Sequence, residues 1–236
     1  MERTQNKKIL ITGGTRGIGK ACVEEFLLNN NEVIYTGTAQ KKSGENFMVA
    51  DFSTLDGINE FCSKVRKLNI DILINNAGIN FPKPFLKEDT EDILKSYYVN
   101  LLAPVLLVKT VLPSMIKNNW GKIINIGSIL GASGKKDRAS YSMTKSGLEA
   151  FTRSIAIEYS KYGINSLCVA PGYIDTDLTR RNLNESERKL IEGSIPIGRF
   201  GTPLELAKII YSFTHDSFNY LSGNTITIDG GISILI

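Results

Sequence analysis

Tyr141 and Lys145 stand four positions apart in the stretch SYSMTKSG, residues 140–147. Residues at this spacing are neighbours on one face of a helix, so a phenol and an ammonium group come together. A free tyrosine has a pKa of about 10 and holds its proton too firmly for efficient exchange near pH 7. A nearby positive charge favours phenolate and lowers that pKa. The pair is a candidate general acid with an activating cation; a surface Tyr–Lys pair without function has the same spacing.

A glycine-rich stretch, ILITGGTRGIGKA at residues 9–21, is the second candidate site. Gly13, Gly17 and Gly19 form the pattern G-x-x-x-G-x-G between an apolar run and an amphipathic one. Small residues at a strand-to-helix turn let backbone N–H groups approach a phosphate, and the start of the helix adds positive partial charge. The pattern favours a dinucleotide site, although a turn without a ligand is the alternative reading.

The end of the second apolar run bears on which dinucleotide is bound. Many NADH sites place an acid there, on the ribose 2′-hydroxyl. This chain has Thr36, Gly37 and Thr38 instead, with no acid before Glu45. Hydroxyls tolerate a 2′-phosphate, and Arg16 can offer it a fork of donors. The sequence therefore predicts NADPH in preference to NADH.

The elements that must position these residues alternate regularly between two patterns. β-branched apolar runs alternate with longer amphipathic stretches, which indicates a parallel sheet covered by helices on both faces. Expected strands lie at 7–12, 32–37, 46–52, 71–77, 121–128, 164–172 and 224–230, and expected helices at 19–30, 55–68, 90–118 and 147–160. We predict a single domain over residues 1–236, an α/β three-layer doubly wound Rossmann fold with about seven parallel strands.

Local signals refine this expectation. Ser53 with Asp56 and Thr202 with Glu205 have the spacing of capping boxes at helix starts. Residues 38–45 are few for a crossover helix, so the second and third strands are expected to connect by a loop.

Composition excludes several classes of protein. The net charge is only +4 and charged residues make up 22% of the chain, without a basic block that would suit nucleic acid. The longest apolar run is interrupted by Pro104 and Lys109, which argues against a membrane span. The three cysteines form no C-x-x-C motif, and His215 is the single histidine. We therefore expect a cytoplasmic protein with reduced thiols and no metal site.

Taken together, the motifs resemble those of the short-chain dehydrogenase/reductase family. The matching features are TGGTRGIG at 12–19, NNAG at 75–78, Asn100, Ser128, Tyr141 with Lys145, and PG at 171–172. IGSILGASG, VAPGYIDTDLT, IPIGRFGTP and ITIDGG make the chain most similar to 3-oxoacyl-[acyl carrier protein] reductases and related carbonyl reductases. The resemblance implies NADPH-dependent reduction of a carbonyl to a secondary alcohol, with a 3-oxoacyl thioester of fatty-acid biosynthesis as the expected substrate.

The resemblance also implies a role for each catalytic residue. Ser128 orients the substrate carbonyl, Tyr141 protonates the alkoxide, and Lys145 holds the nicotinamide ribose. The backbone of Asn100 holds a water that relays protons through the lysine. Pro104 lacks an N–H, which leaves the carbonyl of Asn100 without its helical donor.

The cofactor residues follow from the same motifs. Asp51 and Phe52 correspond to the adenine contact, and Ile174 and Thr176 to the contact with the carboxamide and phosphate. The full expected set is Gly13, Thr15, Arg16, Gly17, Ile18, Gly19, Thr38, Asp51, Phe52, Asn76, Ala77, Gly78, Tyr141, Lys145, Pro171, Gly172, Ile174 and Thr176.

Three loops, at 79–85, 130–140 and 173–194, are expected to surround the substrate. The last is too long for a plain connection, and we predict a substrate lid around residues 173–200. A group of cations in these loops could recruit an anionic substrate, or form only a solvated rim. They are Lys135, Lys136, Arg138, Arg180 and Arg181.

Acyl carrier protein is a possible partner implied by the resemblance, with one departure. Carrier-binding arginines of those reductases are replaced here by Lys117, Lys122 and Lys161. Lysine keeps the charge but loses the bidentate fork, which puts carrier specificity in doubt.

Two other functions fit the same sequence. One is a dehydrogenase or reductase for a sugar, polyol or other small carbonyl in specialised metabolism. The other is a catalytically silent dinucleotide-binding regulator. Family members pair two helices across subunits; stretches 101–116 and 147–160 are rich in apolar residues, so we expect a homotetramer, or else a homodimer.

Overall fold

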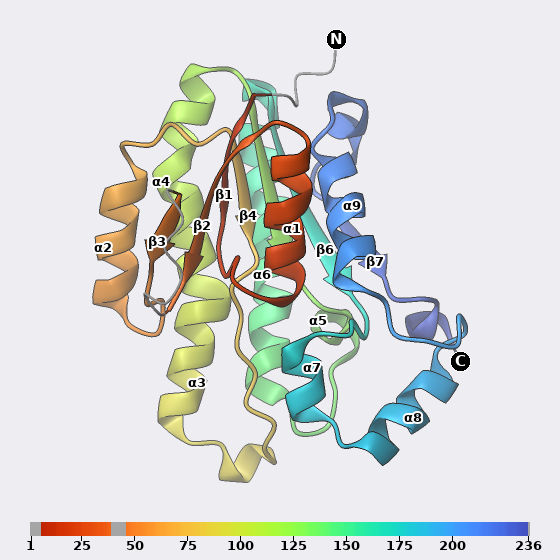
Figure 1. Cartoon of the computed structure of the whole chain (residues 1–236). Helices are drawn as coiled ribbons and strands as arrows, with labels where there is room; N and C mark the ends of the chain where they lie inside the picture. Colours follow the sequence, from red (N-terminus) through yellow and green to blue (C-terminus); the bar gives the residue numbers. More distant parts are fainter. Residues whose placement is uncertain (1–5, 39–45, 236) are drawn as a thin grey trace.

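Seven strands form one parallel sheet in the computed structural model, which describes residues 6–38 and 46–235 (Figure 1). Every pair of neighbouring strands is parallel, and the order across the sheet is β3-β2-β1-β4-β5-β6-β7. The strands are β1 (Lys8–Ile11), β2 (Glu32–Gly37), β3 (Phe47–Val49), β4 (Ile72–Asn75), β5 (Gly121–Ile126), β6 (Ile164–Pro171) and β7 (Thr225–Ile228). The predicted fold class is confirmed, and each strand lies within its expected range.

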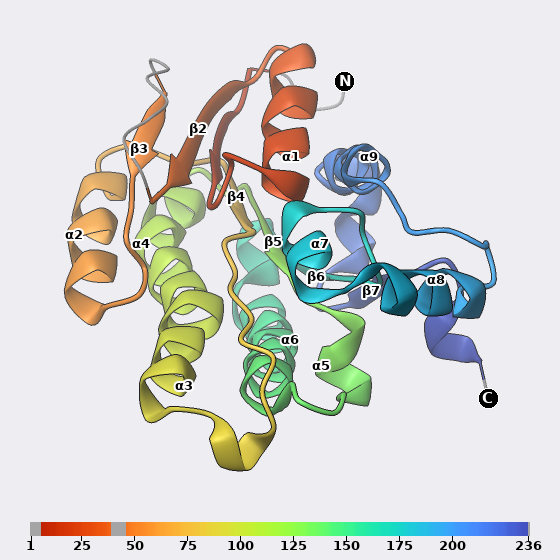
Figure 2. The same ribbon diagram turned by 60° about the horizontal axis from the view of Figure 1, so that its bottom comes forward.

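Helices cover both faces of the sheet (Figures 1 and 2). Helices α1 and α9 lie on one face, and α2, α4 and α6 on the other. The helices are α1 (Gly17–Leu28), α2 (Leu55–Val65), α3 (Thr90–Tyr97), α4 (Ala103–Lys117), α5 (Ile129–Ser133), α6 (Ala139–Tyr159), α7 (Asp177–Asn182), α8 (Glu185–Ser194) and α9 (Pro203–Phe213). Short 3-10 turns are η1 (Phe85–Lys87), η3 (Ser160–Tyr162), η4 (Asp216–Leu221) and η5 (Ile232–Ile234).

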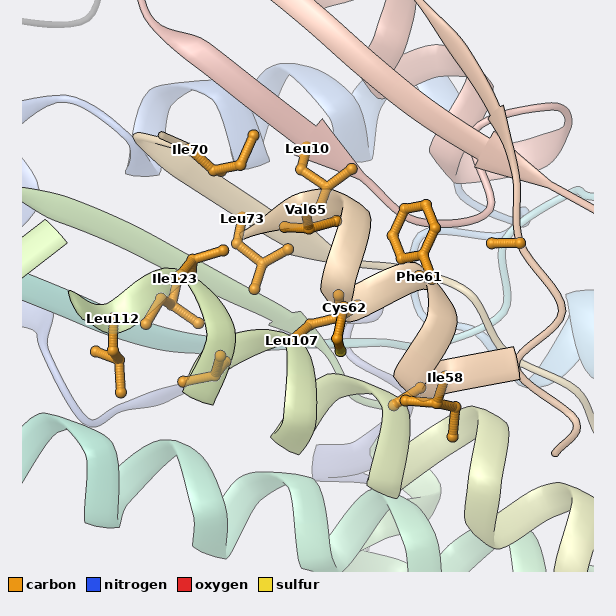
Figure 3. Close-up of a cluster of buried hydrophobic side chains, with 14 of the residues drawn as sticks. Leu10, Ile58, Phe61, Cys62, Val65, Ile70, Leu73, Leu107, Leu112 and Ile123 are labelled. Atoms are coloured by element: carbon orange, nitrogen blue, oxygen red, sulfur yellow. The ribbon is translucent and has the colours of Figure 1, made fainter. Parts of the chain in front are cut away.

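Two apolar cores hold these layers together, and the strands supply both. Successive side chains of a strand point to opposite faces, so Leu10 packs into one core while Ile9 and Ile11 pack into the other. Figure 3 shows the first core, where Phe61 of α2 and Leu107 of α4 pack with strand residues. Fully buried strands on both faces explain why the sequence reads as continuous apolar runs.

Side-chain capping marks the starts of some helices, α2 and α9 among them. At α9 the Thr202 hydroxyl accepts from Glu205 N–H while the glutamate accepts from Thr202 N–H, so the expected capping box is confirmed. The expectation at α2 was wrong by one residue. Thr54 is the cap, accepting from Gly57 N–H at 3.1 Å. Thr54 has the extended backbone of a cap residue, whereas Ser53 lies one position outside the helix and donates its backbone N–H to the Asp51 carboxylate at 2.8 Å.

The long apolar stretch expected as one helix is divided in the structure. A π-helical turn, η2 (Tyr98–Leu102), separates α3 from α4, and Ala103 N–H donates to the carbonyl five residues back. By length and composition Thr90–Lys117 could cross a membrane, but half of its most apolar window is buried inside the protein. Packing in the core therefore accounts for its apolar character. The expected loop crossover after residue 38 falls mostly on residues 39–45, outside the described part.

Candidate active site

The carboxyl ends of the parallel strands meet at one edge of the sheet, and two adjoining cavities lie there. The larger, about 590 Å³, is within the usual range for ligand sites. All of the expected cofactor residues except Gly19 line it, and so does Ser128. The smaller, about 120 Å³, shares Ser128 and Tyr141 with the larger one. These two side chains therefore stand where the cavities meet.

In the glycine-rich stretch that joins β1 to α1, Gly13, Gly17 and Gly19 are needed for backbone conformation or for close packing. Gly13 and Gly17 have φ of +68° and +54°, a region that favours glycine. A Cβ at Gly13 would lie 3.0 Å from the Ala77 backbone. At Gly19 a Cβ would overlap the Gly13 carbonyl oxygen, so this glycine lets the helix pack under the loop and does not line the cavity.

Thr12 and Asn76 fix the loops after β1 and β4 against each other. Thr12 Oγ1 accepts from the backbone N–H groups of Asn76 and Ala77, at 2.9 and 3.0 Å. The Asn76 amide donates back to the carbonyls of Thr12 and Gly13, at 2.9 and 3.0 Å. The cradle is thus held open by side-chain bonds. Exposed N–H groups at a helix start and positive-φ glycines fit a dinucleotide phosphate.

The end of β2 forms the wall where a ribose would lie. The Thr36 hydroxyl accepts from Gly13 N–H at 3.0 Å, and Thr36 and Thr38 both line the cavity. Arg16 is the residue before α1; its side chain is exposed and also lines the cavity. Within the described ranges Arg16 forms no ion pair, so its guanidinium is available to an anionic ligand.

Lys145 is buried beneath the junction of the two cavities, with 4% of its surface exposed. Its Nζ donates to the Ile126 carbonyl at 2.7 Å and lies 5.7 Å from the centre of the Tyr141 ring. Burial lowers the pKa of this ammonium to about 8. About nine molecules in ten still carry the charge at pH 7.

The Tyr141 phenol departs from the sequence expectation. Burial raises its pKa, while a hydrogen bond with Ser128 and the positive charge of Arg138 act in the opposite direction. Lys145 directs its proton to a backbone carbonyl and does not offset that burial. In the protein alone burial therefore outweighs the effect of the lysine charge, and the phenol is protonated at pH 7 and has a proton to give.

Ser128 is held rigidly beside the phenol. It is the residue before α5, and its hydroxyl accepts from Leu130 N–H at 3.2 Å. Only 8% of its surface is exposed, and it borders both cavities. Its oxygen is placed to touch a carbonyl that enters from the smaller cavity.

Asn100 lies in the π-helical turn and is completely buried. Its Oδ1 accepts from Ile79 N–H at 2.8 Å, and its Nδ2 donates to the Ile79 carbonyl at 2.9 Å and to Thr144 Oγ1 at 3.3 Å. The side chain thus clamps the loop that follows Gly78 onto α6, the helix that carries Lys145. Sequence reasoning considered its backbone and missed this clamp.

The segment predicted as a lid contains α7 and α8 and packs against the glycine-rich loop. Thr176 caps α7, accepting from Thr179 N–H at 3.3 Å, and a Cβ at Gly17 would lie 3.3 Å from the Thr176 methyl group. Asp175 binds Arg180 through two bonds of 3.0 Å and Arg188 at 2.8 Å. These ion pairs hold the pKa of the Asp175 carboxyl far below its usual range.

Sequence reasoning also missed individual residues. The bonds of Thr12, which belongs to the TGGTRGIG motif and lines neither cavity, were not expected. Loops around the substrate were expected, but not which of their residues line the smaller cavity. Asn80, Tyr173 and Leu183 lie in loops without regular spacing, and only the folded chain shows that they border the smaller cavity. Among the described residues, no group of three or more histidine, cysteine, aspartate or glutamate side chains comes together as a metal site.

Comparisons with known proteins agree with this geometry. Residues 7–187 match the model of the short chain dehydrogenase family. The chain is 36% identical over 248 residues to the 3-oxoacyl-[acyl-carrier-protein] reductase of Aquifex aeolicus, covering 98% of each protein. It is 35% identical over 246 residues to that of Pseudomonas aeruginosa, covering 97% of this chain and 98% of the other.

Solved structures give a second comparison. A candidate NAD(P)-dependent gluconate 5-dehydrogenase from Beutenbergia cavernae, crystallised with bound NADP, superposes with a TM-score of 0.92 and 25% identity, covering 98% of both chains. A candidate gluconate dehydrogenase from Agrobacterium tumefaciens has a TM-score of 0.89 and 27% identity, covering 99% of this chain and 98% of the other. This chain belongs to the short-chain dehydrogenase family and is an NAD(P)-dependent oxidoreductase that acts on CH–OH or carbonyl groups.

Proposed function

We propose that this protein reduces a carbonyl to a secondary alcohol with NADPH, that Tyr141 is the general acid, and that 3-oxoacyl thioesters are its substrates. The observation that carries the proposal is the position of Ser128 and Tyr141 where the two cavities meet, with the buried Lys145 Nζ 5.7 Å from the centre of the Tyr141 ring. A dinucleotide fits the larger cavity, and a carbonyl can approach from the smaller one.

The bound cofactor would supply a hydride to the carbonyl carbon. Ser128 holds the carbonyl oxygen in place, because Leu130 N–H fixes the position of its hydroxyl. The Tyr141 hydroxyl then donates its proton to the oxygen as negative charge develops there. A raised phenol pKa favours reduction, which needs a proton donor, over oxidation, which needs phenolate.

Lys145 supports this step in two ways. Its charge lies near the phenol ring and stabilises the phenolate that remains after proton transfer. With a pKa of about 8, its ammonium can also return a proton at neutral pH. The Asn100 side chain holds the Ile79 backbone through two hydrogen bonds. It thereby keeps the loop that contains Ile79 in position for both roles of the lysine.

The preference for NADPH rests on Arg16 and Thr38. Both line the larger cavity where a 2′-phosphate would lie, and neither is acidic. Arg16 offers paired donors to a phosphate. The Beutenbergia protein of the same fold binds NADP. Comparable catalytic efficiency with NADH would contradict this part of the proposal.

The thioester assignment is supported by the likeness to 3-oxoacyl-[acyl-carrier-protein] reductases over nearly the whole chain. An acidic carrier protein would meet Lys117 and Lys161, which are exposed. The expectation for Lys122 was wrong: it is 1% exposed and donates to Asn219 and to the His215 carbonyl. Lys122 lies on β5, a strand that is buried on both faces, so it cannot contact a carrier protein.

A second candidate is reduction or oxidation of a small keto or hydroxy acid. The solved structures described as gluconate dehydrogenases favour it, as do the two cations that border the smaller cavity. This candidate needs the same Tyr141 and Ser128.

We also propose that the segment 173–200 closes over bound substrate, and that the protein is a cytoplasmic homotetramer or homodimer. Ile157 on α6 is 84% exposed, as an interface residue would be in a single chain. The three cysteines are free and buried, which fits a reducing compartment. A monomeric mass in solution would contradict the assembly.

The test is oxidation of NADPH by the purified protein with an acetoacetyl thioester, a simple ketone and a keto sugar acid. Turnover of the thioester supports the main proposal. Turnover of the keto acid alone selects the second candidate. Cofactor binding without turnover of any carbonyl would indicate a silent regulator.

A further inference from the structure

The smaller cavity contains positive charge without an acid. Lys135 and Arg138 border it, and none of the described residues that line it is aspartate or glutamate. Lys135 Nζ donates to the Tyr173 hydroxyl at 2.6 Å, at the exposed end of the cavity. Arg138 is half-buried on the same wall as Tyr141, close enough for its charge to act on the phenol.

Several neighbouring arginines are neutralised by acids, and Lys136 and Arg181 do not line the cavity. Arg180 and Arg188 both bind Asp175, and Arg199 binds Glu205. In the described parts of the chain neither Lys135 nor Arg138 has an ion pair. The hydrogen bond of the Arg138 guanidinium goes to the Asp137 carbonyl at 2.8 Å.

Burying the charge of the Arg138 guanidinium raises the free energy of the folded protein unless an opposite charge compensates it. Burial lowers the pKa of Arg138, and the charges of Asp137 and Glu187, neither of which lines the cavity, offset only part of that effect. Taking a charge out of water without a partner is unfavourable, and an anion offsets that cost. Asn80 Oδ1, also on this cavity, is buried without a hydrogen-bond partner among the described residues; as an acceptor it can take a hydrogen bond from a substrate hydroxyl but does not bind a carboxylate.

We propose that the smaller cavity is an anion subsite in which Arg138, with Lys135 at its mouth, binds a carboxylate on the same small molecule as the reacting carbonyl. The inference rests on the proposed carbonyl chemistry and favours the second candidate substrate class, small oxo acids, over thioesters. Arg138 binds and selects the substrate; Tyr141 and Ser128 perform the reaction.

The size of the cavity favours a carboxylate over a distant phosphate. A volume of about 120 Å³ corresponds to roughly four water molecules. A short acid fits there with its carbonyl at Tyr141. The phosphate of a thioester carrier lies many bonds from the carbonyl, beyond a cavity of this size. A planar guanidinium matches a carboxylate through two parallel bonds.

The experiment compares three substrates that share one reacting ketone, with NADPH as the reductant. Acetoacetate carries the carboxylate, methyl acetoacetate is its neutral counterpart, and acetoacetyl-CoA carries distant phosphates. We expect Arg138→Gln to lower kcat/KM for acetoacetate by about 10- to 100-fold, the usual effect of losing a charge-assisted bond. Values for the ester and the CoA thioester should change less than about threefold, within context-dependent variation of such contacts.

Lys136→Gln is the matched control. Lys136 is in the same loop, is exposed and does not line the cavity, so kcat/KM should change little for all three substrates. Arg138→Lys keeps the charge without the fork and should recover part of the acetoacetate activity. Thermal melts of all variants separate loss of the subsite from loss of the fold.

The outcomes are distinct. A loss confined to acetoacetate supports the proposal; equal losses for all three substrates, or none, overturn it. A loss confined to the CoA thioester would show that Arg138 binds a phosphate and would also overturn it.

If the unmodified protein reduces none of the substrates, the proposed function fails while the subsite remains testable by ligand-observed NMR with NADP⁺ present. Butyrate binding, absent for butyramide and lost in Arg138→Gln but not in Lys136→Gln, would still support the subsite. Equal butyrate and butyramide signals, or butyrate binding unchanged in Arg138→Gln, would overturn it.

Discussion

Replacing Lys145 by methionine should make the protein more stable while it abolishes activity. The ammonium is 4% exposed and has lost its hydration, and its described partner is the Ile126 carbonyl. Methionine has a similar length and no charge, so it fills the same space without that penalty. Lys145, which the reaction requires, then lowers the free energy of unfolding.

The size of the effect follows from the pKa of Lys145. Burial moves it from 10.5 to about 8, which corresponds to roughly 3 kcal/mol against the charged form at neutral pH. The methionine variant also loses the bond to the Ile126 carbonyl, worth about 1 kcal/mol. The net gain is about 2 kcal/mol, or about 4–8 °C in Tm for a chain of this size.

The dependence on pH gives the sharper test. Because the folded pKa lies below the unfolded one, the unfolded chain binds more protons between about pH 8 and pH 10.5. Stability of the unmodified protein therefore rises with pH across this window. The methionine variant lacks this pH dependence. Its stability advantage over the unmodified protein is therefore largest at pH 7 and disappears by about pH 10.

Chemical denaturation at pH 7, 8.5 and 10 measures this difference. Tyr141→Phe is the matched control, because it removes the catalytic hydroxyl, keeps the buried charge, and should show the stability–pH slope of the unmodified protein. A methionine variant that is less stable at pH 7, or whose advantage is the same at every pH, would refute the reasoning.

Four further outcomes are expected. Gly19→Ala should weaken NADP⁺ binding at least about tenfold, measured by calorimetry, because its Cβ overlaps the Gly13 carbonyl; Gly193→Ala, where nothing lies within 4 Å, should not. Asn100→Ala leaves buried backbone groups unpaired and should lower Tm by about 5–12 °C in a thermal melt. Thr38→Asp should shift the ratio of kcat/KM values toward NADH by about tenfold or more. Oxidation of the product alcohol should speed up as pH rises above 8, since the phenol pKa is raised; a rate that is flat with pH would contradict this.

Elements with strong local patterns could be predicted from the sequence. Strands such as β5 and β6 are buried along their whole length, so their composition alone identifies them. The capping box of α9 depends on residues three positions apart and was also predictable. Thr54 was missed because three neighbouring polar residues could each cap α2, and only the backbone geometry selects one.

The site could be predicted from the sequence where motifs fix the backbone. It could be predicted less well where burial determines the hydrogen-bond partners and pKa values of the side chains. The cavity contains nearly all of the expected cofactor residues because they lie at strand ends on one edge of the sheet. Spacing alone could not show that Lys145 points to a backbone carbonyl, or that burial outweighs its charge at Tyr141. Spacing also could not distinguish Arg138, which has no ion pair among the described residues, from Arg180, which has one. The acid that neutralises Arg180 lies five residues away and is recognised only from contacts.

The central claim is that Tyr141 donates a proton during NADPH-dependent carbonyl reduction. The most direct test is the rate of NADPH oxidation with an acetoacetyl thioester and with acetoacetate, for the unmodified protein and for Tyr141→Phe. We expect substrate-dependent oxidation with at least one of them, reduced by a factor of about 10²–10⁴ in the variant, with NADP⁺ affinity retained. Equal rates in the two proteins would contradict the account.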